Sequence, residues 1–211
     1  MDITNLREDY CQSGLNRKDL MESPFEQFNK WFEQAQSAGI QEPNAMSIST
    51  VSALGVPSSR TVLLKIYDDK GFVFFTNYES EKAQDIAQNP NVALLFPWIS
   101  LERQVRISGY VEKITSKESL AYFSSRPKGS QIGAWISPQS KIIESRDFLK
   151  QKLTEMKAKF SEGNIPLPKA WGGYRVVPVK FEFWQGRTSR LHDRFVYLKQ
   201  AEDWTVNRLA P

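Results

Sequence analysis

The sequence has few of the residues on which several common chemistries depend. It contains one cysteine, Cys11, and one histidine, His192, in 211 residues. These two cannot build a disulfide framework or a Cys/His zinc site, so we expect no bound metal. The sequence also lacks the GxGxxG, GxxxxGK[ST] and GxSxG patterns of dinucleotide sites, P-loops and hydrolase triads. Redox chemistry on this chain would therefore need a cofactor.

Long apolar runs are missing too. No stretch is long enough to span a bilayer, and the start, MDITNLREDY, lacks the basic-then-apolar layout of a secretory signal. These two absences predict a cytoplasmic protein with no membrane association. The 40% hydrophobic content is enough for one sizeable core. We expect a mobile N-terminal arm over residues 1–20, which show no sustained periodicity, and a single domain over residues 21–211.

The charge balance is basic but dispersed. The net charge is +4 and the pI is about 9.1, which by itself is compatible with nucleic-acid binding. However, the basic residues are interleaved with acidic ones and form neither a tail nor a continuous stripe. This pattern favours a few discrete phosphate sites, and we expect no nucleic-acid partner.

The apolar spacing predicts a mostly β protein with appended helices. A capping box at Ser23 followed by Pro24 starts an amphipathic helix that ends before Gly39. Three further helices are expected over residues 80–88, 116–125 and 145–160. Segments rich in Val, Ile, Phe and Thr predict strands over residues 45–53, 59–67, 72–76, 92–98, 103–114, 173–177, 180–184, 195–199 and 204–208. A mostly antiparallel barrel fits this order better than alternating βαβ units.

Three groups of basic and polar residues are candidates for function. Arg60 and Lys65 lie five residues apart on one expected strand, so they should face opposite sides and serve different environments; on spacing alone, ordinary surface charges are the simpler interpretation. Tyr122, Arg126, Lys128 and Ser130 fall on a helix end and the loop after it. These residues could hold a phosphate monoester, or Arg126 could merely stabilise a helix C-terminus.

The third group is the segment 187–194, RTSRLHDR. It places three arginines and the only histidine beside one aspartate, directly after the apolar run FEFWQG. A solvated surface alone explains this charge density poorly. A functional site and a structural histidine are equally compatible with it.

Taken together, these motifs resemble the pyridoxamine 5'-phosphate oxidase family. The resemblance extends from LREDY near the start to the terminal RLAP, and its most specific part is FEFWQGRTSRLHDR at residues 181–194. Four supporting motifs occur in the same order: SRTVLLK at 59–65, ERQVRISG at 102–109, YFSSRPKGSQIGAW at 122–135 and WGGYRVVP at 171–178. The resemblance implies an FMN-binding split β-barrel and a homodimer with each flavin held between subunits.

The same resemblance assigns roles to individual residues. It implies FMN contacts by Arg60, Thr61, Val62, Leu63, Leu64, Lys65, Phe75, Thr76, Lys82, Gln104, Gln139, Ser140, Trp184 and Arg194. It implies substrate contacts by Arg7, Tyr10, Lys65, Tyr122, Arg126, Ser130, Arg190 and His192. Arg190 and His192 are the catalytic candidates, and the implied reaction oxidises pyridoxamine or pyridoxine 5'-phosphate to pyridoxal 5'-phosphate with O2, releasing peroxide.

One position departs from the family pattern. Glu81 stands directly before Lys82, where the family has a basic residue, and a carboxylate there would repel a phosphate. We expect Glu81 to face solvent, since neighbours on a helix point in different directions. Two other functions compete with the oxidase: a non-catalytic flavin or haem carrier on the same barrel, and a nucleic-acid-binding barrel with exposed stacking aromatics.

Overall fold

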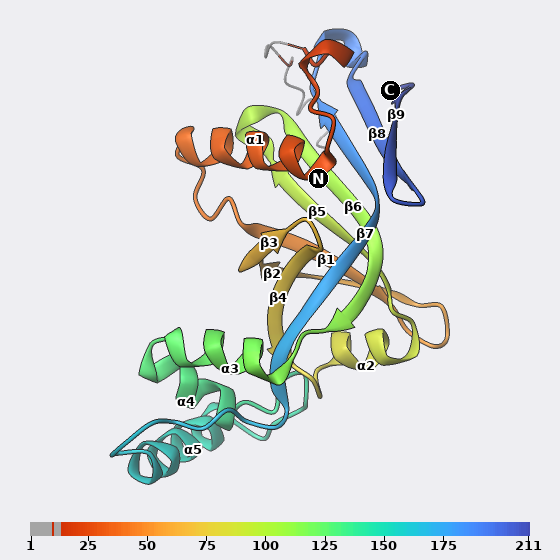
Figure 1. The fold of residues 1–211 in the computed structure, drawn as a ribbon. Coiled ribbons are helices and arrows are strands. Elements are labelled where there is room, and N and C mark those ends of the chain that lie inside the picture. Colours follow the sequence, from red (N-terminus) through yellow and green to blue (C-terminus); the bar gives the residue numbers. More distant parts are fainter. Residues whose placement is uncertain (1–9, 11–13) are drawn as a thin grey trace, which may run out of the picture.

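The fold is a curled antiparallel sheet with helices at its two ends (Figure 1). The computed structural model describes residue 10 and residues 14–211. The strands are Ala45–Val51 (β1), Pro57–Leu63 (β2), Ile66–Asp68 (β3), Gly71–Asn77 (β4), Asn91–Trp98 (β5), Arg103–Lys113 (β6), Trp171–Gln185 (β7), Asp193–Gln200 (β8) and Asp203–Leu209 (β9). No helix within these described residues is long and apolar enough to cross a membrane.

The strand order brings the two ends of the sheet together. Hydrogen-bonded neighbours follow the order β2-β1-β5-β6-β7-β4-β3, and every pair is antiparallel. Just beyond β2, the Lys65 amide donates to the Val73 carbonyl of β4 at 2.9 Å. This bond extends the pairing of β3 with β4, and the chain passes directly from β2 into β3, so the two ends of the strand order are brought together. The sheet therefore curls into a half-barrel, as expected from the sequence.

The long strand β7 connects two regions of the molecule. Its first half pairs with β4 and its second half with β8, while β6 runs along its other side. The register with β6 shifts at a bulge between Ser108 and Gly109. A Cβ on Gly109 would lie 2.1 Å from the Val177 carbonyl oxygen, so only glycine permits this close approach.

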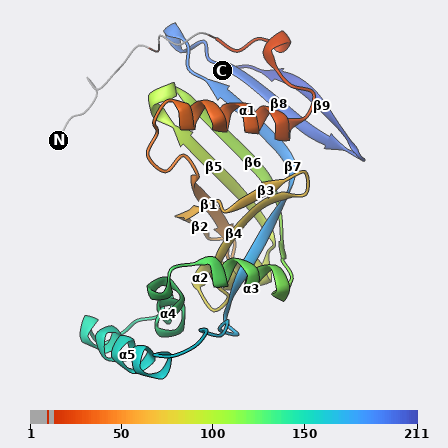
Figure 2. The same ribbon diagram turned by 60° about the vertical axis from the view of Figure 1, so that its left-hand side comes forward.

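The α-helices are Pro24–Ser37 (α1), Glu81–Gln88 (α2), Ser116–Ser125 (α3), Lys128–Ile136 (α4) and Arg146–Lys159 (α5). Helix α1 lies across β5 and β6 in both views (Figure 2). The Ser23 hydroxyl caps it, and Phe28 and Trp31 enter the main core. Helices α3, α4 and α5 gather at the opposite end of the barrel over a second apolar cluster that contains Phe123, Ile132 and Trp171. Short 3₁₀ turns complete the chain at Arg17–Asp19, Ile99–Leu101 and Thr188–Arg190.

The structure corrects three sequence-based boundaries. The expected strand 59–67 is two strands, β2 and β3, because the chain turns between Leu63 and Ile66. The expected strands 173–177 and 180–184 are one, β7, which passes Pro178 at the bulge. Lys128 and Ser130, expected in a loop, begin helix α4 after Pro127, whose fixed φ suits a helix start.

Most of the predicted N-terminal arm, residues 1–9 and 11–13, lies outside the described residues. Arg7 is among them. Within the described part, Leu15 is buried in the main core and its amide donates to Asp193 at 3.0 Å. The mobility of the arm stays a prediction.

Candidate active site

A cavity of about 610 Å³ opens between β2, β4, α2 and α4. Its volume is in the usual range for small-molecule sites. Twelve of the residues predicted to bind cofactor or substrate line it: Arg60, Thr61, Val62, Leu63, Lys65, Phe75, Thr76, Lys82, Tyr122, Arg126, Gln139 and Ser140. The cavity therefore brings together residues that lie up to eighty positions apart in the sequence.

Arg60 and Lys65 both line this cavity, so the prediction that they serve different environments is wrong. The alternation argument assumed one continuous strand. Because β2 ends at Leu63, Lys65 lies in the connection to β3 and no longer follows the strand alternation.

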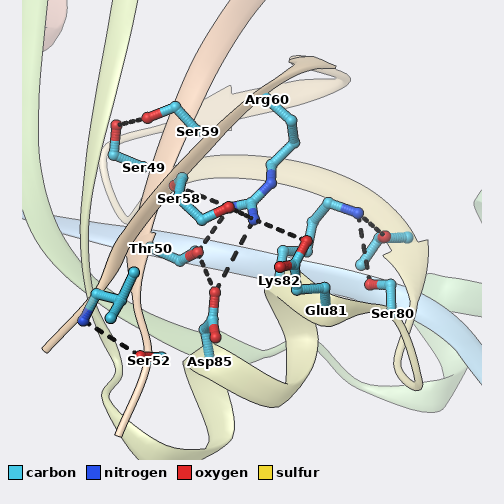
Figure 3. A network of polar contacts seen from close by, with 12 residues as sticks. Ser49, Thr50, Ser52, Ser58, Ser59, Arg60, Ser80, Glu81, Lys82 and Asp85 are labelled. Atoms are coloured by element: carbon cyan, nitrogen blue, oxygen red, sulfur yellow. Dashed lines mark hydrogen bonds and ion pairs between the residues drawn. The ribbon is translucent and has the colours of Figure 1, made fainter. Parts of the chain in front are cut away.

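The guanidinium of Arg60 is held by its own strand, β2, and by the neighbouring strand β1 (Figure 3). Its Nη1 donates to Thr50 Oγ1 at 2.6 Å and to the Ser58 carbonyl at 3.1 Å, and its Nη2 donates to Ser58 Oγ at 2.7 Å. Two carboxylates of α2 face the same guanidinium: Asp85 at 3.9 Å and Glu81 at 3.8 Å. Arg60 is thus fixed before any ligand enters.

Glu81 is exposed to solvent but also contacts Arg60. Its side chain is 66% exposed, which agrees with the solvent-facing orientation expected from the sequence. Its carboxylate nevertheless reaches Arg60 and lines the cavity. Glu81 therefore covers part of a cation that an anionic ligand would need.

Lys82 occupies the inner wall of the cavity. It is only 5% exposed, and its Nζ donates to Thr76 Oγ1 at 3.2 Å and to Ser80 Oγ at 3.4 Å. Gln139 accepts from Thr76 Oγ1 at 3.2 Å and so joins the same network. Burial lowers the pKa of Lys82, Arg60 lowers it further by charge repulsion, and Glu81 partly opposes both effects. A bound anion would stabilise the buried ammonium of Lys82 and offset its repulsion by Arg60.

Arg126 presents a free donor beside stacked aromatic rings. Its guanidinium carbon lies 4.7 Å from the Trp171 ring centroid, and the Phe75 ring stacks between Tyr122 at 3.9 Å and Trp171 at 5.3 Å. The Arg126 Nη1 atom is buried without a hydrogen-bond partner among the described residues. An unpartnered buried donor is costly, so this atom is suited to receive an acceptor from a ligand. Burial also raises the pKa of Tyr122.

The remaining predicted residues lie elsewhere. A second cavity, of about 350 Å³, is lined by Tyr10, Gln104 and Trp184 together with Pro97, Ile99, Glu102 and Arg103. The His192 ring packs 4.6 Å from Trp184 and 5.6 Å from Tyr10. The His192 Nδ1 atom accepts from the Arg187 amide at 3.2 Å, which leaves Nε2 to carry the proton of the neutral ring.

Five predicted residues in the described part of the chain line neither cavity, and His192, described above, is one of them. Arg194 binds the buried Glu182 through Nε at 2.9 Å and Nη2 at 2.8 Å. Arg190 is exposed with a left-handed backbone (φ 61°) next to His192. Leu64 is buried in the main core, and Ser130 is exposed on α4.

The two cavities lie at opposite ends of β7. Trp171 lines the first and Trp184 the second. At about 3.3 Å per residue, the strand between them would extend roughly 40 Å if it were straight, so the two cavities are separate sites within a chain.

Sequence reasoning missed several residues of the first cavity. Asn77, Ser137 and Trp171 line it without having been predicted. Trp171 begins the motif WGGYRVVP, so its position in that motif was the available signal. Ser137 follows the unpredicted helix α4, and without that helix its placement could not be inferred.

Comparison with known proteins gives consistent matches along the chain. Residues 32–160 match the family model described as pyridoxamine 5'-phosphate oxidase. Residues 171–211 match the model described as the pyridoxine 5'-phosphate oxidase C-terminal dimerisation region. The pyridoxine/pyridoxamine 5'-phosphate oxidases of Crocosphaera subtropica and Aliarcobacter butzleri are 61% and 58% identical, and each match covers 100% of both chains.

A solved structure agrees with these matches. The chain resembles PhzG from Burkholderia lata 383, solved with tetrahydrophenazine-1-carboxylic acid, with a TM-score of 0.87 and 27% identity over 92% of this chain and 95% of that one. An FMN-binding protein of Nostoc punctiforme related to pyridoxamine 5'-phosphate oxidase shares the fold, with a TM-score of 0.72 and 16% identity over 91% of this chain and 100% of that one. The family matches and full-length relatives show that this chain belongs to the pyridoxamine 5'-phosphate oxidase family.

Proposed function

We propose that this chain is an FMN-dependent oxidase that converts pyridoxine 5'-phosphate and pyridoxamine 5'-phosphate to pyridoxal 5'-phosphate, with O2 as electron acceptor. The observation that carries the proposal is the charge of the first cavity. Among the described residues, its lining has four cationic side chains, those of Arg60, Lys65, Lys82 and Arg126, and one carboxylate, that of Glu81. Flavin mononucleotide and the substrate each bring one phosphate monoester, and the cavity has cations for both.

The hydrogen-bond donors of the cavity are of the types that bind a phosphate such as that of FMN. Arg60, Lys82 and Thr76 would hold its phosphate, and Gln139 and Ser140 would contact it nearby. The lowered pKa of Lys82 supports this assignment, because a buried ammonium lacking a carboxylate in hydrogen-bond contact is stabilised by an anion. The chemistry that FMN supplies when bound is acceptance of a hydride and delivery of the electrons to O2, which becomes hydrogen peroxide.

Lys65, Tyr122 and Arg126 form the proposed clamp for the substrate phosphate, with Ser130 on the neighbouring helix. The unpartnered Nη1 of Arg126 is the clearest donor of this group. Holding the phosphate fixes the end of the substrate remote from the reacting carbon. Binding energy there can then orient that carbon for hydride transfer.

We further propose that the active form is a homodimer in which each site uses both chains. The C-terminal match to a dimerisation region supports this arrangement. So does the separation of the two cavities along β7. The partner would then bring its Trp184 and Arg194 to the flavin and its Arg190 and His192 over the substrate ring. The protonated Nε2 of His192 suits it to donate to a polar substituent of that ring.

The competing functions find less support. In a nucleic-acid-binding barrel, the stacking aromatics would be exposed beside a continuous cationic groove. Here Phe75, Tyr122 and Trp171 instead stack on one another at the cavity wall. A flavin carrier without catalysis would leave the free Arg126 donor without a purpose.

The test is to record the absorption spectrum of the purified protein and to follow peroxide formation. We expect flavin bands, and peroxide with pyridoxine 5'-phosphate but not with unphosphorylated pyridoxine. Tetrahydrophenazine-1-carboxylic acid, the ligand of the Burkholderia relative, serves as an alternative substrate control. Equal turnover of pyridoxine and its phosphate would contradict the proposed phosphate clamp. A purified protein that binds no flavin would contradict the proposed oxidase function.

A further inference from the structure

Two buried residues behind the cavity are connected to Arg60 but do not line the cavity. Thr50 of β1 is fully buried and Asp85 of α2 is 8% exposed. Their side chains join at 2.6 Å, between Thr50 Oγ1 and Asp85 Oδ2. Figure 3 shows both pointing toward the guanidinium of Arg60.

The direction of this hydrogen-bond chain is fixed by chemistry. A guanidinium only donates, so Thr50 Oγ1 must accept from Arg60 Nη1 at 2.6 Å. The single hydroxyl proton of Thr50 is then available for Asp85, which as a carboxylate only accepts. Asp85 therefore sets the orientation of the Thr50 hydroxyl, and the hydroxyl in turn sets the position of Arg60.

These contacts use some of the N–H donors of Arg60 and leave the others available to a ligand. Thr50 and Ser58 together occupy three of the five guanidinium N–H groups. Asp85 also lies 3.9 Å from Arg60 Nη2, so its charge compensates the buried end of the guanidinium. The remaining donors can serve the cavity without Arg60 having to be reoriented.

Helix α2 links this chain to the second cation of the site. Asp85 ties α2 to β1, and Lys82 of the same helix contacts Thr76 of β4. Arg60 and Lys82 carry like charges that disfavour each other's approach, and after burial the charge of Arg60 is the second cause of the lowered pKa of Lys82. A fixed α2 keeps both cations in place before an anion arrives.

We propose that Thr50 and Asp85 are positioning residues that hold Arg60 in its phosphate-binding orientation, so that the protein favours FMN over flavins without a phosphate. This inference rests on the proposed FMN site. It assigns a function to two residues that touch neither ligand.

The test compares FMN with riboflavin, which has the same ring system but no phosphate. Affinities of the apo-protein for both are measured by quenching of flavin fluorescence in wild type, Thr50→Val and Thr50→Ser. Valine keeps the shape of threonine without its hydroxyl. Losing one charge-assisted hydrogen bond should weaken FMN binding by about tenfold in Thr50→Val, with riboflavin binding unchanged and Thr50→Ser close to wild type.

A double-mutant cycle shows whether the effect passes through Arg60. In an Arg60→Ala background, Thr50→Val should change FMN affinity by less than about twofold, because the residue it positions is gone. Asp85→Ala should weaken FMN binding when Arg60 is present and have little effect when Arg60 is absent. Tighter FMN binding in Asp85→Ala would instead make Asp85 a competitor of the phosphate and overturn its positioning role.

Thermal unfolding of each apo-variant serves as the folding control. Equal weakening of FMN and riboflavin binding would indicate a general structural defect and overturn the inference. Additive effects in the cycle would overturn it as well. If wild type binds neither flavin, it is the proposed function that fails, and if it binds both equally, Arg60 does not serve the phosphate.

Discussion

The two cavities differ in how complete they are within one chain. The first gathers twelve predicted ligand-binding residues, and two of its cations, Arg60 and Lys82, are already held by hydrogen bonds. The second is smaller and holds aromatic surfaces. Its lining arginine, Arg103, donates to Gln185, and the nearby Arg194 donates to Glu182. In the proposed dimer, one chain would preform the phosphate end of the site, and a second chain would complete the ring end.

The largest effect is expected from removing Arg126, the unpartnered donor of the first cavity. Arg126→Ala removes a buried charged donor that would contact the substrate phosphate in both ground and transition states. We expect KM for pyridoxine 5'-phosphate to rise by about 10- to 100-fold with little change in kcat. Arg146→Ala, at an exposed position that begins α5, is the matched control. An unchanged KM in Arg126→Ala would exclude this residue from the clamp.

The second expected effect is a pH dependence of FMN affinity that arises from the protonation of Lys82. Its pKa lies below the ordinary value of 10.5, so its ammonium loses its proton at a lower pH than an exposed lysine does. FMN affinity should therefore fall as the pH rises toward 10.5, by up to about tenfold as one charged contact is lost. Lys82→Arg keeps its charge through this range and should flatten the profile. Identical profiles for wild type and Lys82→Arg would show that Lys82 does not contact the phosphate.

The smallest effect concerns Glu81, which competes for Arg60 from an exposed position. Glu81→Gln removes the charge and should tighten FMN binding by only about two- to fivefold, because solvent screens the pair. Glu79→Gln, on an exposed residue outside the cavity lining, is the control. Tightening of tenfold or more would show that Glu81 lies closer to the phosphate than the structure places it.

The sequence predicted the barrel and much of the first cavity for identifiable reasons. Alternating apolar residues set the strands, and the capping residue Ser23 and Pro24 set the start of α1. The motif around Arg60 was one of the five motifs behind the resemblance that assigned the cofactor contacts. The Thr50–Asp85 contact was not predictable in this way, because a hydrogen bond across 35 positions leaves no local pattern.

Other errors came from treating the chain as locally regular. The turn after Leu63 moved Lys65 to the same cavity as Arg60, and neither alternation nor composition signals that turn. Helix α4 contains two glycines, Gly129 and Gly133, which lower intrinsic helix propensity. Packing of Ile132 into the second apolar cluster stabilises it instead, and such tertiary contacts cannot be derived from propensity.

The most direct test of the account is a mixed dimer. One chain carries Lys82→Ala with Arg126→Ala in the first cavity, the other carries Arg190→Ala with His192→Ala near the second, and different tags allow purification of the heterodimer. If each site uses both chains, one of the two sites is intact, and the heterodimer should show about half the wild-type activity while both parents are nearly inactive. A purified heterodimer as inactive as its parents would contradict the account, because each site would then be built within a single chain.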